Sequence, residues 1–178
     1  MTWKIEHQKP LIDAKVFKLE EVKFKESPIH YSRIVSNDWV NVLPITADKK
    51  AVMIKQFRAG VMQYTLEVPG GMFDGDEKDA TMVAARELEE ETGYTSMRIL
   101  PLATLNSNPA ILSNKLHMFL ALNCQLSPDR KHFPDESENI EIELVDYKEL
   151  EGLVRTGRID HSLSALTIML ALKYLYIK

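Results

Sequence analysis

A short acidic run near the middle of the chain has the residue types and the spacing that could bind a metal. Residues 86–93 read Arg-Glu-Leu-Glu-Glu-Glu-Thr-Gly. On a helix, which turns by about 100° per residue, Glu87, Glu90 and Glu91 fall on one stripe. Small apolar residues occupy the same stripe one and two turns earlier: Ala80, Val83 and Ala84. A stripe that begins apolar is expected to face protein, yet this one ends in three carboxylates.

Carboxylates that face protein together destabilise one another unless another group neutralises them. A hard divalent cation with oxygen ligands does so, and Mg²⁺ usually binds together with substrate phosphates. The stripe therefore predicts metal-assisted chemistry. The same residues allow an alternative, a solvated helix face on which Arg86 pairs with Glu90 four residues later. Glu89 points away from the stripe and is expected on the solvated side.

Composition limits the remaining classes of function. The chain has 178 residues, 45% of them hydrophobic, and a net charge of −4, so we expect one domain with a real core, or one domain with an appendage. The acidic balance argues against nucleic-acid binding. The only cysteine, Cys124, lies in an apolar run and is expected to be a core thiol, which suits a reducing compartment. With no long apolar segment, the chain is predicted to be soluble and cytoplasmic, without membrane contact.

The first forty residues differ from the rest of the chain. Short polar-leaning segments with strand character span residues 2–7, 15–24 and 29–35, broken by Lys9-Pro10 and Ser27-Pro28. They contain few large apolar residues and cannot form a core alone. They are expected either to lie against the main body or to pair with another subunit.

From Asp38 onward, strands and helices intersperse. The pattern predicts a hairpin over residues 38–46 and 51–57, a strand that ends at Val68-Pro69-Gly70-Gly71, and further strands over residues 97–105, 115–124 and 140–145. It predicts helices over residues 77–92, 147–155 and 162–176, the first of them stopped by Gly93. This arrangement indicates an α/β fold in which helices cover both faces of a mixed sheet.

Gly71, Glu77 and residues 86–94 together resemble the Nudix box, the loop–helix–loop motif of enzymes that cut diphosphates attached to another moiety. Eight residues separate Glu77 from Arg86 where the usual box has seven. The extra residue precedes the carboxylate stripe and leaves it intact, but the resemblance then carries no role over to Glu77. The resemblance implies a Nudix-type α/β/α sandwich over residues 41–178 and an N-terminal β-strand appendage over residues 1–40.

The Nudix resemblance implies roles for the box residues. The matching glutamates Glu87, Glu90 and Glu91 would bind Mg²⁺ or Mn²⁺, and the carbonyl beside the box glycine, that of Gly70, would add a ligand. Glu87 and Glu91 are one turn apart and Glu90 is three residues from Glu87, so all three could reach one metal cluster. Arg86 would pair with a box glutamate and orient it. The backbone at Gly71 would approach metal and phosphate closely, which a residue without a side chain permits.

From about Asp38 onward the chain also resembles the ADP-ribose and nucleoside-diphosphate-sugar pyrophosphatase branch. Ile54-Lys55-Gln56-Phe57-Arg58 is similar to a strand of that branch whose arginine contacts substrate, which implies this role for Arg58. Pro109 lies fifteen residues beyond the box, a spacing that goes with ADP-ribose-type substrates. Residues 108–114 depart from the Ser-Pro-Gly form common among ADP-ribose enzymes, which keeps other nucleotide sugars open. Trp39 could stack on a base or pack in the core.

Residues 135–140 resemble the acidic loop that supplies a catalytic base in this branch. Glu136 is the predicted base, with Glu138 as the alternative base or a further metal ligand. Two or three Mg²⁺ would neutralise the diphosphate and make water more acidic, and a loop carboxylate would take its proton.

The predicted function is therefore Mg²⁺-dependent hydrolysis of ADP-ribose or another nucleoside diphosphate sugar to a nucleoside monophosphate and a sugar phosphate. The alternatives are a nucleotide-sugar sensor that does not cut its ligand, or a hydrolase of dinucleotides or nucleoside triphosphates. The resemblance also implies a homodimer in which residues 1–40 exchange across the interface.

Overall fold

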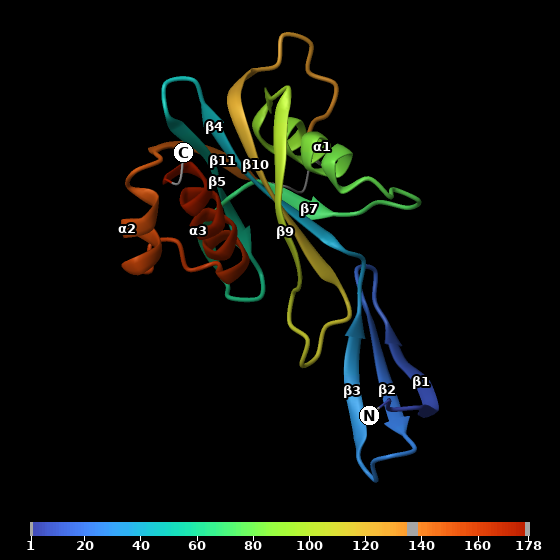
Figure 1. Cartoon of the computed structure of the whole chain (residues 1–178). Helices are drawn as coiled ribbons and strands as arrows, with labels where there is room; N and C mark the ends of the chain where they lie inside the picture. The colour runs from blue at the N-terminus through green and yellow to red at the C-terminus, as the bar shows by residue number, and fades with distance from the viewer. Residues whose placement is uncertain (1, 135–138, 177–178) are drawn as a thin grey trace. The chain divides into compact units, whose positions relative to one another are not determined.

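The computed structural model describes residues 2–134 and 139–176 of the chain. The chain divides into two compact units (Figure 1). The smaller unit comprises Met1–Asp38 and Leu105–Leu116, and the larger comprises Trp39–Thr104 and His117–Lys178.

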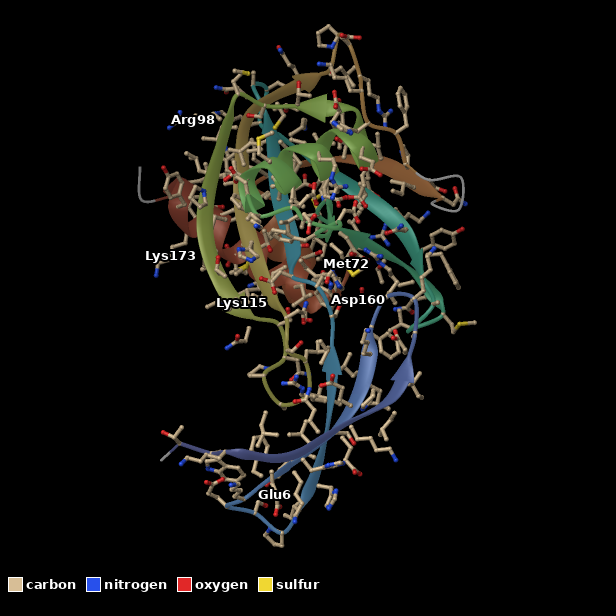
Figure 2. All side chains as sticks on the ribbon, turned by 90° about the vertical axis from the view of Figure 1, so that its right-hand side faces the viewer. Glu6, Met72, Arg98, Lys115, Asp160 and Lys173 are labelled. Carbon is tan, nitrogen blue, oxygen red and sulfur yellow. The ribbon has the colours of Figure 1, made fainter. Side chains whose placement is uncertain are left out.

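The smaller unit is built on a three-stranded antiparallel sheet of β1 (Ile5–Asp13), β2 (Lys18–Phe24) and β3 (His30–Val35), in that order. All nine β1 residues are exposed, and side chains project from both faces of the sheet around the labelled Glu6 (Figure 2). The expected break at Lys9-Pro10 was wrong, because β1 runs through Pro10. As an edge strand, β1 tolerates a residue without an N–H, and its register shifts between Pro10 and Ile12.

The sheet of the larger unit has the strand order β11-β5-β4-β10-β8. These strands span Ile140–Asp146, Lys50–Arg58, Trp39–Thr46, Lys115–Leu126 and Tyr94–Thr95. Three further strands pair with members of this path: β6 (Gln63–Glu67) with β5, β7 (Gly70–Met72) with β4, and β9 (Arg98–Asn106) with β10. The predicted strands are confirmed to within a few residues at their ends.

The helices α1 (Ala80–Thr92) and α3 (Ser162–Tyr176) lie on opposite sides of the sheet, with α2 (Leu150–Arg155) beside α3 (Figure 1). Alternation along β4 accounts for this, since successive side chains point to opposite faces. Val42 packs in the core with Leu88 of α1, whereas Leu43 packs with Ile168 of α3. The predicted α/β/α arrangement with a mixed sheet is therefore confirmed.

The box helix begins three residues later than predicted. Asp79 has extended backbone and caps α1, because its carboxylate accepts from the N–H groups of Thr81 (2.9 Å) and Met82 (3.4 Å). The end was predicted correctly: Gly93 has φ 71°, a left-handed conformation that favours glycine, and its N–H donates to the Glu89 carbonyl. The carboxylates of the box thus lie in the last two turns of α1.

Two composition-based expectations can be compared with the structure. Cys124 is buried in the core beneath α1, and burial raises the pKa of its thiol to about 11, as expected of a core thiol. Across residues 2–134 and 139–176, none of the helices has the length and apolar character needed to cross a membrane.

Candidate active site

Two of the three stripe carboxylates are buried where α1 meets the sheet. Glu87 and Glu91 are only 8% and 6% exposed, and the side chain of Glu90 is 22% exposed. They follow the apolar turn that packs Val83 and Ala84 against β4 and β10. A solvated acidic face is therefore excluded for Glu87 and Glu91, and the predicted change from apolar to acidic along one stripe is confirmed.

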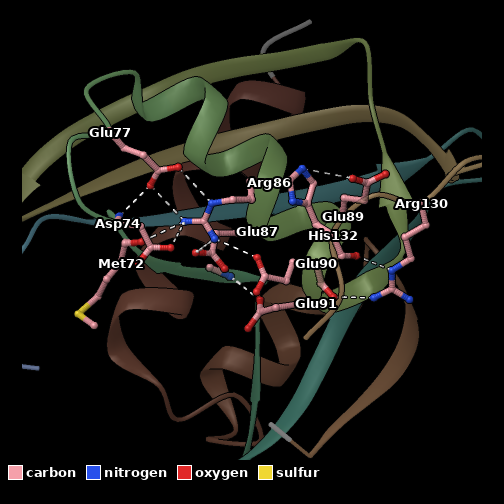
Figure 3. Close-up of polar contacts among 11 residues, drawn as sticks. Met72, Asp74, Glu77, Arg86, Glu87, Glu89, Glu90, Glu91, Arg130 and His132 are labelled. Atoms are coloured by element: carbon pink, nitrogen blue, oxygen red, sulfur yellow. Dashed lines mark hydrogen bonds and ion pairs between the residues drawn. The ribbon is translucent and has the colours of Figure 1, made fainter. Parts of the chain in front are cut away.

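Arg86 is the centre of this cluster (Figure 3). Its Nη1 lies 3.0 Å from Oε1 of Glu87 and 3.0 Å from Oε2 of Glu90. The Arg86–Glu90 pair is the i,i+4 contact that the alternative interpretation required, but here it belongs to a half-buried network rather than to a solvated face. Burial alone would lower the pKa of Arg86, yet hydrogen bonding to Glu77 and the charge of Glu87 raise it above its ordinary value. Arg86 is thus a permanent cation among carboxylates.

Glu77, to which the box resemblance carried no role, joins the same network. Its Oε1 and Oε2 accept from Nε (3.2 Å) and Nη2 (3.3 Å) of Arg86, and Oε2 also accepts from the Asp74 N–H (2.8 Å). Nη2 of Arg86 donates further to the Met72 carbonyl at 3.2 Å. One guanidinium therefore ties the loop before the helix to two carboxylates within it. The extra residue between Glu77 and Arg86 is accommodated ahead of the helix, where the chain does not have to keep helical spacing.

The carboxylate of Glu91 contacts the backbone of the double glycine, Gly70-Gly71. Its Oε2 accepts from the Gly70 N–H at 2.7 Å, and Gly71 passes so close to Glu87 that an added Cβ would lie 2.6 Å from the Glu87 Cδ. The carboxylates of Glu87 and Glu91 therefore lie against the same short stretch of backbone. This close approach explains why the position of Gly71 requires a residue without a side chain.

The donor set fits a hard divalent cation. Buried oxygen donors outnumber the one guanidinium beside them, and Mg²⁺ and Mn²⁺ prefer such donors. Within the part of the chain that the structure describes, no three His, Cys, Asp or Glu side chains converge on one ion position. Arg86 lies between Glu87 and Glu90 instead. A carboxylate has two oxygens and can contact a guanidinium and a cation together, so the two arrangements are compatible.

Alanine at the two glycines is expected to have different consequences. At Gly70 the added Cβ would overlap the backbone carbonyl of Val40, which cannot move without disturbing the β4–β7 pairing. We expect Gly70→Ala to lower the free energy of unfolding by about 1–3 kcal/mol. At Gly71 the added Cβ would overlap the end of the Glu87 side chain, which can rotate away. Gly71→Ala should therefore keep most of its stability and lose Mg²⁺-dependent activity more than about tenfold, as outer partners of metal sites do.

Chemical denaturation and activity assays on the same variants check this contrast. Gly60→Ala is the matched control, since no atom lies within 4 Å of its added Cβ. Equal loss of stability at Gly70 and Gly71 would contradict the assigned contacts.

Glu89 is not on a solvated face, and that expectation was wrong. It is 8% exposed, Oε1 accepts from the Ser127 hydroxyl at 2.8 Å, and Oε2 lies 3.8 Å from Nε2 of His132. Arg130 adds a contact to the same end of α1, donating to the Glu90 carbonyl at 2.6 Å (Figure 3). The segment after β10 covers this side of α1, which helical periodicity alone does not indicate. Glu89 nevertheless contacts a different segment from the Arg86 network.

Arg58 lies at the end of β5, and its side chain is 40% exposed. Its Nε and Nη2 donate to the two carboxylate oxygens of Glu67 on β6, at 2.7 and 2.8 Å. The Glu67 side chain is 2% exposed and also lies 3.1 Å from Nδ1 of His161. The sequence predicted Arg58, but it predicted neither Glu67, which accepts from Arg58, nor His161, which lies against Glu67. Pairing of the neighbouring strands β5 and β6 could have suggested that Glu67 lies near Arg58. Nothing in the sequence connects His161 to this pair.

The remaining predicted residues are distributed as follows. Trp39 begins β4, where it pairs with Met72 of β7, and it is half-buried. Pro109 belongs to the smaller unit. Glu136 and Glu138 lie outside the described residues. The structure thus brings the box residues together, and the roles of Trp39, Pro109, Glu136 and Glu138 stay predictions.

Comparisons with known proteins agree with this geometry. Residues 37–164 match the NUDIX domain family. An ADP-ribose pyrophosphatase of Bacillus subtilis (strain 168) is 31% identical over 140 residues, which is 78% of this chain and 72% of that protein. An ADP-sugar pyrophosphatase of Mus musculus is 42% identical over 64 residues, 33% of this chain and 28% of that protein. A solved structure described as an ADP compounds hydrolase has the same fold, with a TM-score of 0.85, 21% identity, and coverage of 99% of this chain and 95% of that chain.

The family match extends over well more than half of the chain and includes the whole Arg86 network together with Gly70 and Gly71. The chain therefore belongs to the NUDIX domain family and is an enzyme of the Nudix hydrolase type.

Proposed function

We propose that the chain hydrolyses the diphosphate of ADP-ribose or of another nucleoside diphosphate sugar to a nucleoside monophosphate and a sugar phosphate. The observation that carries the proposal is the pair of buried carboxylates, Glu87 and Glu91, that lies against Gly70-Gly71, with Arg86 in contact with Glu87. The names of the relatives in Bacillus subtilis and Mus musculus support this class of substrate.

The box residues are the proposed metal and catalytic set. Glu87, Glu90, Glu91 and the Gly70 carbonyl would hold Mg²⁺, or Mn²⁺ in its place. When bound, the cations would neutralise the negative charge of the diphosphate and lower the pKa of the attacking water. Arg86 keeps Glu87 and Glu90 oriented through contacts of 3.0 Å to each. Because the guanidinium of Arg86 supplies part of the charge compensation, it holds these two carboxylates in place before substrate enters.

Substrate binding and proton transfer are proposed for residues around this set. The exposed head of Arg58 would contact the diphosphate, and backbone at Gly71 would approach it. Trp39 would stack on the base, and the spacing of Pro109 from the box supports an ADP-ribose-type substrate. Glu136 would accept the proton of the attacking water, with Glu138 as the alternative base or a metal ligand; a positioned base typically contributes about 10²–10⁴-fold.

A product assay across substrate classes tests the proposal. We expect hydrolysis of ADP-ribose, ADP-glucose or GDP-mannose in the presence of Mg²⁺, read as phosphate that added phosphatase releases from the monoester products. Dinucleotides and nucleoside triphosphates are tested in the same assay as alternative substrates. Glu91→Gln is the negative control for contaminating activity. Preferred cleavage of a dinucleotide or triphosphate would replace the substrate class, and no cleavage in any arm would favour a sensor.

We also propose that the chain forms a homodimer through residues 1–40. The sheet of β1–β3 buries Val22 at 2% exposure, while Ile5, Ile12 and Phe17 are between 38% and 55% exposed. A three-stranded sheet needs more apolar burial than this for independent stability. A sedimentation measurement that finds a monomer at working concentration would contradict the proposed dimer.

The single buried Cys124 suits a reducing compartment such as the cytoplasm.

A further inference from the structure

Glu67 on β6 is a buried carboxylate whose oxygens are contacted by three other parts of the chain. Oε1 accepts from the Thr65 hydroxyl and from Nε of Arg58 (2.7 Å). Oε2 accepts from Nη2 of Arg58 (2.8 Å) and lies 3.1 Å from Nδ1 of His161. Three hydrogen bonds and the imidazole of His161 therefore surround the two oxygens of this carboxylate.

The contacts around Glu67 keep it ionised and hold Arg58 in one orientation. Burial alone would raise the pKa of Glu67, but the hydrogen bonds and charge of Arg58 lower it below its ordinary value. Nε and Nη2 of Arg58 are both committed to Glu67, while the side chain as a whole remains 40% exposed. The edge of the guanidinium that carries Nε and Nη2 is therefore held against Glu67. The position of the Glu67 carboxylate then sets the orientation of the whole guanidinium.

His161 in turn fixes that carboxylate. It lies at the start of α3, where its carbonyl accepts the Ala165 N–H at 2.9 Å. Nδ1 also lies 2.8 Å from the hydroxyl of Ser164, which accepts the N–H of Val68, the residue that follows Glu67. Nδ1 of His161 therefore faces Oε2 of Glu67 while its hydrogen bond is with Ser164, and this bond holds the imidazole beside the carboxylate.

The charge state of His161 follows from the groups that face it. Burial lowers its pKa below 6.5 and Arg58 lowers it further, against the opposite effects of Glu67 and Asp160. His161 is therefore neutral at neutral pH, and it lies against Glu67 without adding a second cation. Its Nδ1 approaches the same oxygen, Oε2, that accepts from Nη2 of Arg58.

We propose that His161 is a positioning residue of the substrate site: through Glu67 it sets the orientation of Arg58 and leaves more of the guanidinium charge available to the substrate diphosphate. The inference rests on the proposed function, because it takes Arg58 as the group that meets the diphosphate. A second role is possible for the same contacts, namely that they only tie α3 to β6. The neighbouring bond from Gln63 to Asp160 (2.9 Å) ties the same two segments without touching Glu67.

A double-mutant cycle separates positioning from a purely structural tie. His161→Leu should raise KM for ADP-ribose by roughly 3- to 10-fold, the factor expected when one buried polar contact is lost, with kcat changed less than about twofold. His161→Asn keeps a donor near Nδ1 and should restore most of the wild-type KM. In an Arg58→Ala background, His161→Leu should have no further effect on KM. Gln63→Ala is the matched control and should leave KM unchanged.

The proposal is overturned if the effect of His161→Leu on KM persists undiminished in the Arg58→Ala background. It is also overturned if His161→Leu lowers the melting temperature and leaves KM unaltered. Calorimetric binding of ADP to the wild type, to His161→Leu, to Arg58→Ala and to the double variant repeats the cycle without turnover. If no nucleotide sugar is cleaved, the proposed function fails while coupling in ADP affinity still supports positioning by His161; if ADP does not bind, both fail.

Discussion

Glu91→Gln is expected to reduce turnover by more than about 100-fold and to raise the Mg²⁺ concentration needed for half-maximal rate. Outer partners of metal sites typically cost about 10–100-fold when they are changed, and a proposed direct ligand should cost at least as much. Glutamine keeps the size of the side chain and an oxygen that can accept the Gly70 N–H, now at 2.7 Å from Glu91. The substitution therefore removes charge and preserves shape. Steady-state kinetics over a Mg²⁺ titration measure the effect.

Glu89→Gln is the control for this prediction, since it makes the same change two residues earlier on α1. The Glu89 carboxylate contacts Ser127 and His132 rather than the Arg86 network. We expect kcat and the Mg²⁺ requirement to stay close to wild type, while the melting temperature falls by a few degrees because a buried carboxylate loses its charge-assisted contacts. Comparable loss of turnover in both variants would contradict the division of α1 into two acidic faces.

Arg86→Ala is expected to cause the largest loss of stability, about 2–4 kcal/mol. Removal of one partner leaves Glu77, Glu87 and Glu90 near one another without their shared cation, and an uncompensated buried charge is costly. Added Mg²⁺ should recover more of the melting temperature in this variant than in wild type, since binding to the folded state stabilises it by mass action. Arg86→Lys should be intermediate, because an ammonium lacks the planar fork that reaches several carboxylates at once.

Thermal unfolding with and without Mg²⁺ measures this effect, and Arg158→Ala supplies the comparison. Arg158 lies 3.7 Å from Glu143 and its side chain is 56% exposed. An exposed pair of this kind contributes at most about 1 kcal/mol. If Arg158→Ala and Arg86→Ala destabilise equally, or if Mg²⁺ stabilises Arg86→Ala no more than wild type, the central role of Arg86 is wrong.

The site could be predicted wherever its residues are neighbours on one element. Glu87 and Glu91 are one helical turn apart, and the small residues ahead of them mark the face that packs on the sheet. Periodicity alone therefore predicted the burial of Glu87 and Glu91, while Glu90 on the same stripe is half-buried. It failed for Glu89, because burial of that residue depends on a segment some forty positions later that no local pattern connects to α1.

Two predicted element boundaries were wrong, for different reasons. The predicted start of the box helix missed Asp79, whose side chain ends the preceding loop by capping α1. Pro10 was expected to break a strand, but the edge position of β1 removes the need for its N–H. For Pro10 the position of the strand in the sheet decided the outcome, whereas Asp79 is a local capping signal that the prediction did not use.

The sequence by itself indicated the family through the resemblance of residues 71–94 to the Nudix box. It indicated the α/β architecture and the face of Glu87 and Glu91 because helical and strand periods place side chains on faces without reference to distant contacts. Only the tertiary structure decided that Glu77 shares Arg86 with Glu87, that Glu89 anchors the segment after β10, and that Glu67 joins Arg58 to His161. Each of these is a hydrogen-bonded contact that depends on how separate segments pack. A buried carboxylate must find its partners wherever the folded chain supplies them, and their positions in the sequence are not constrained by any period.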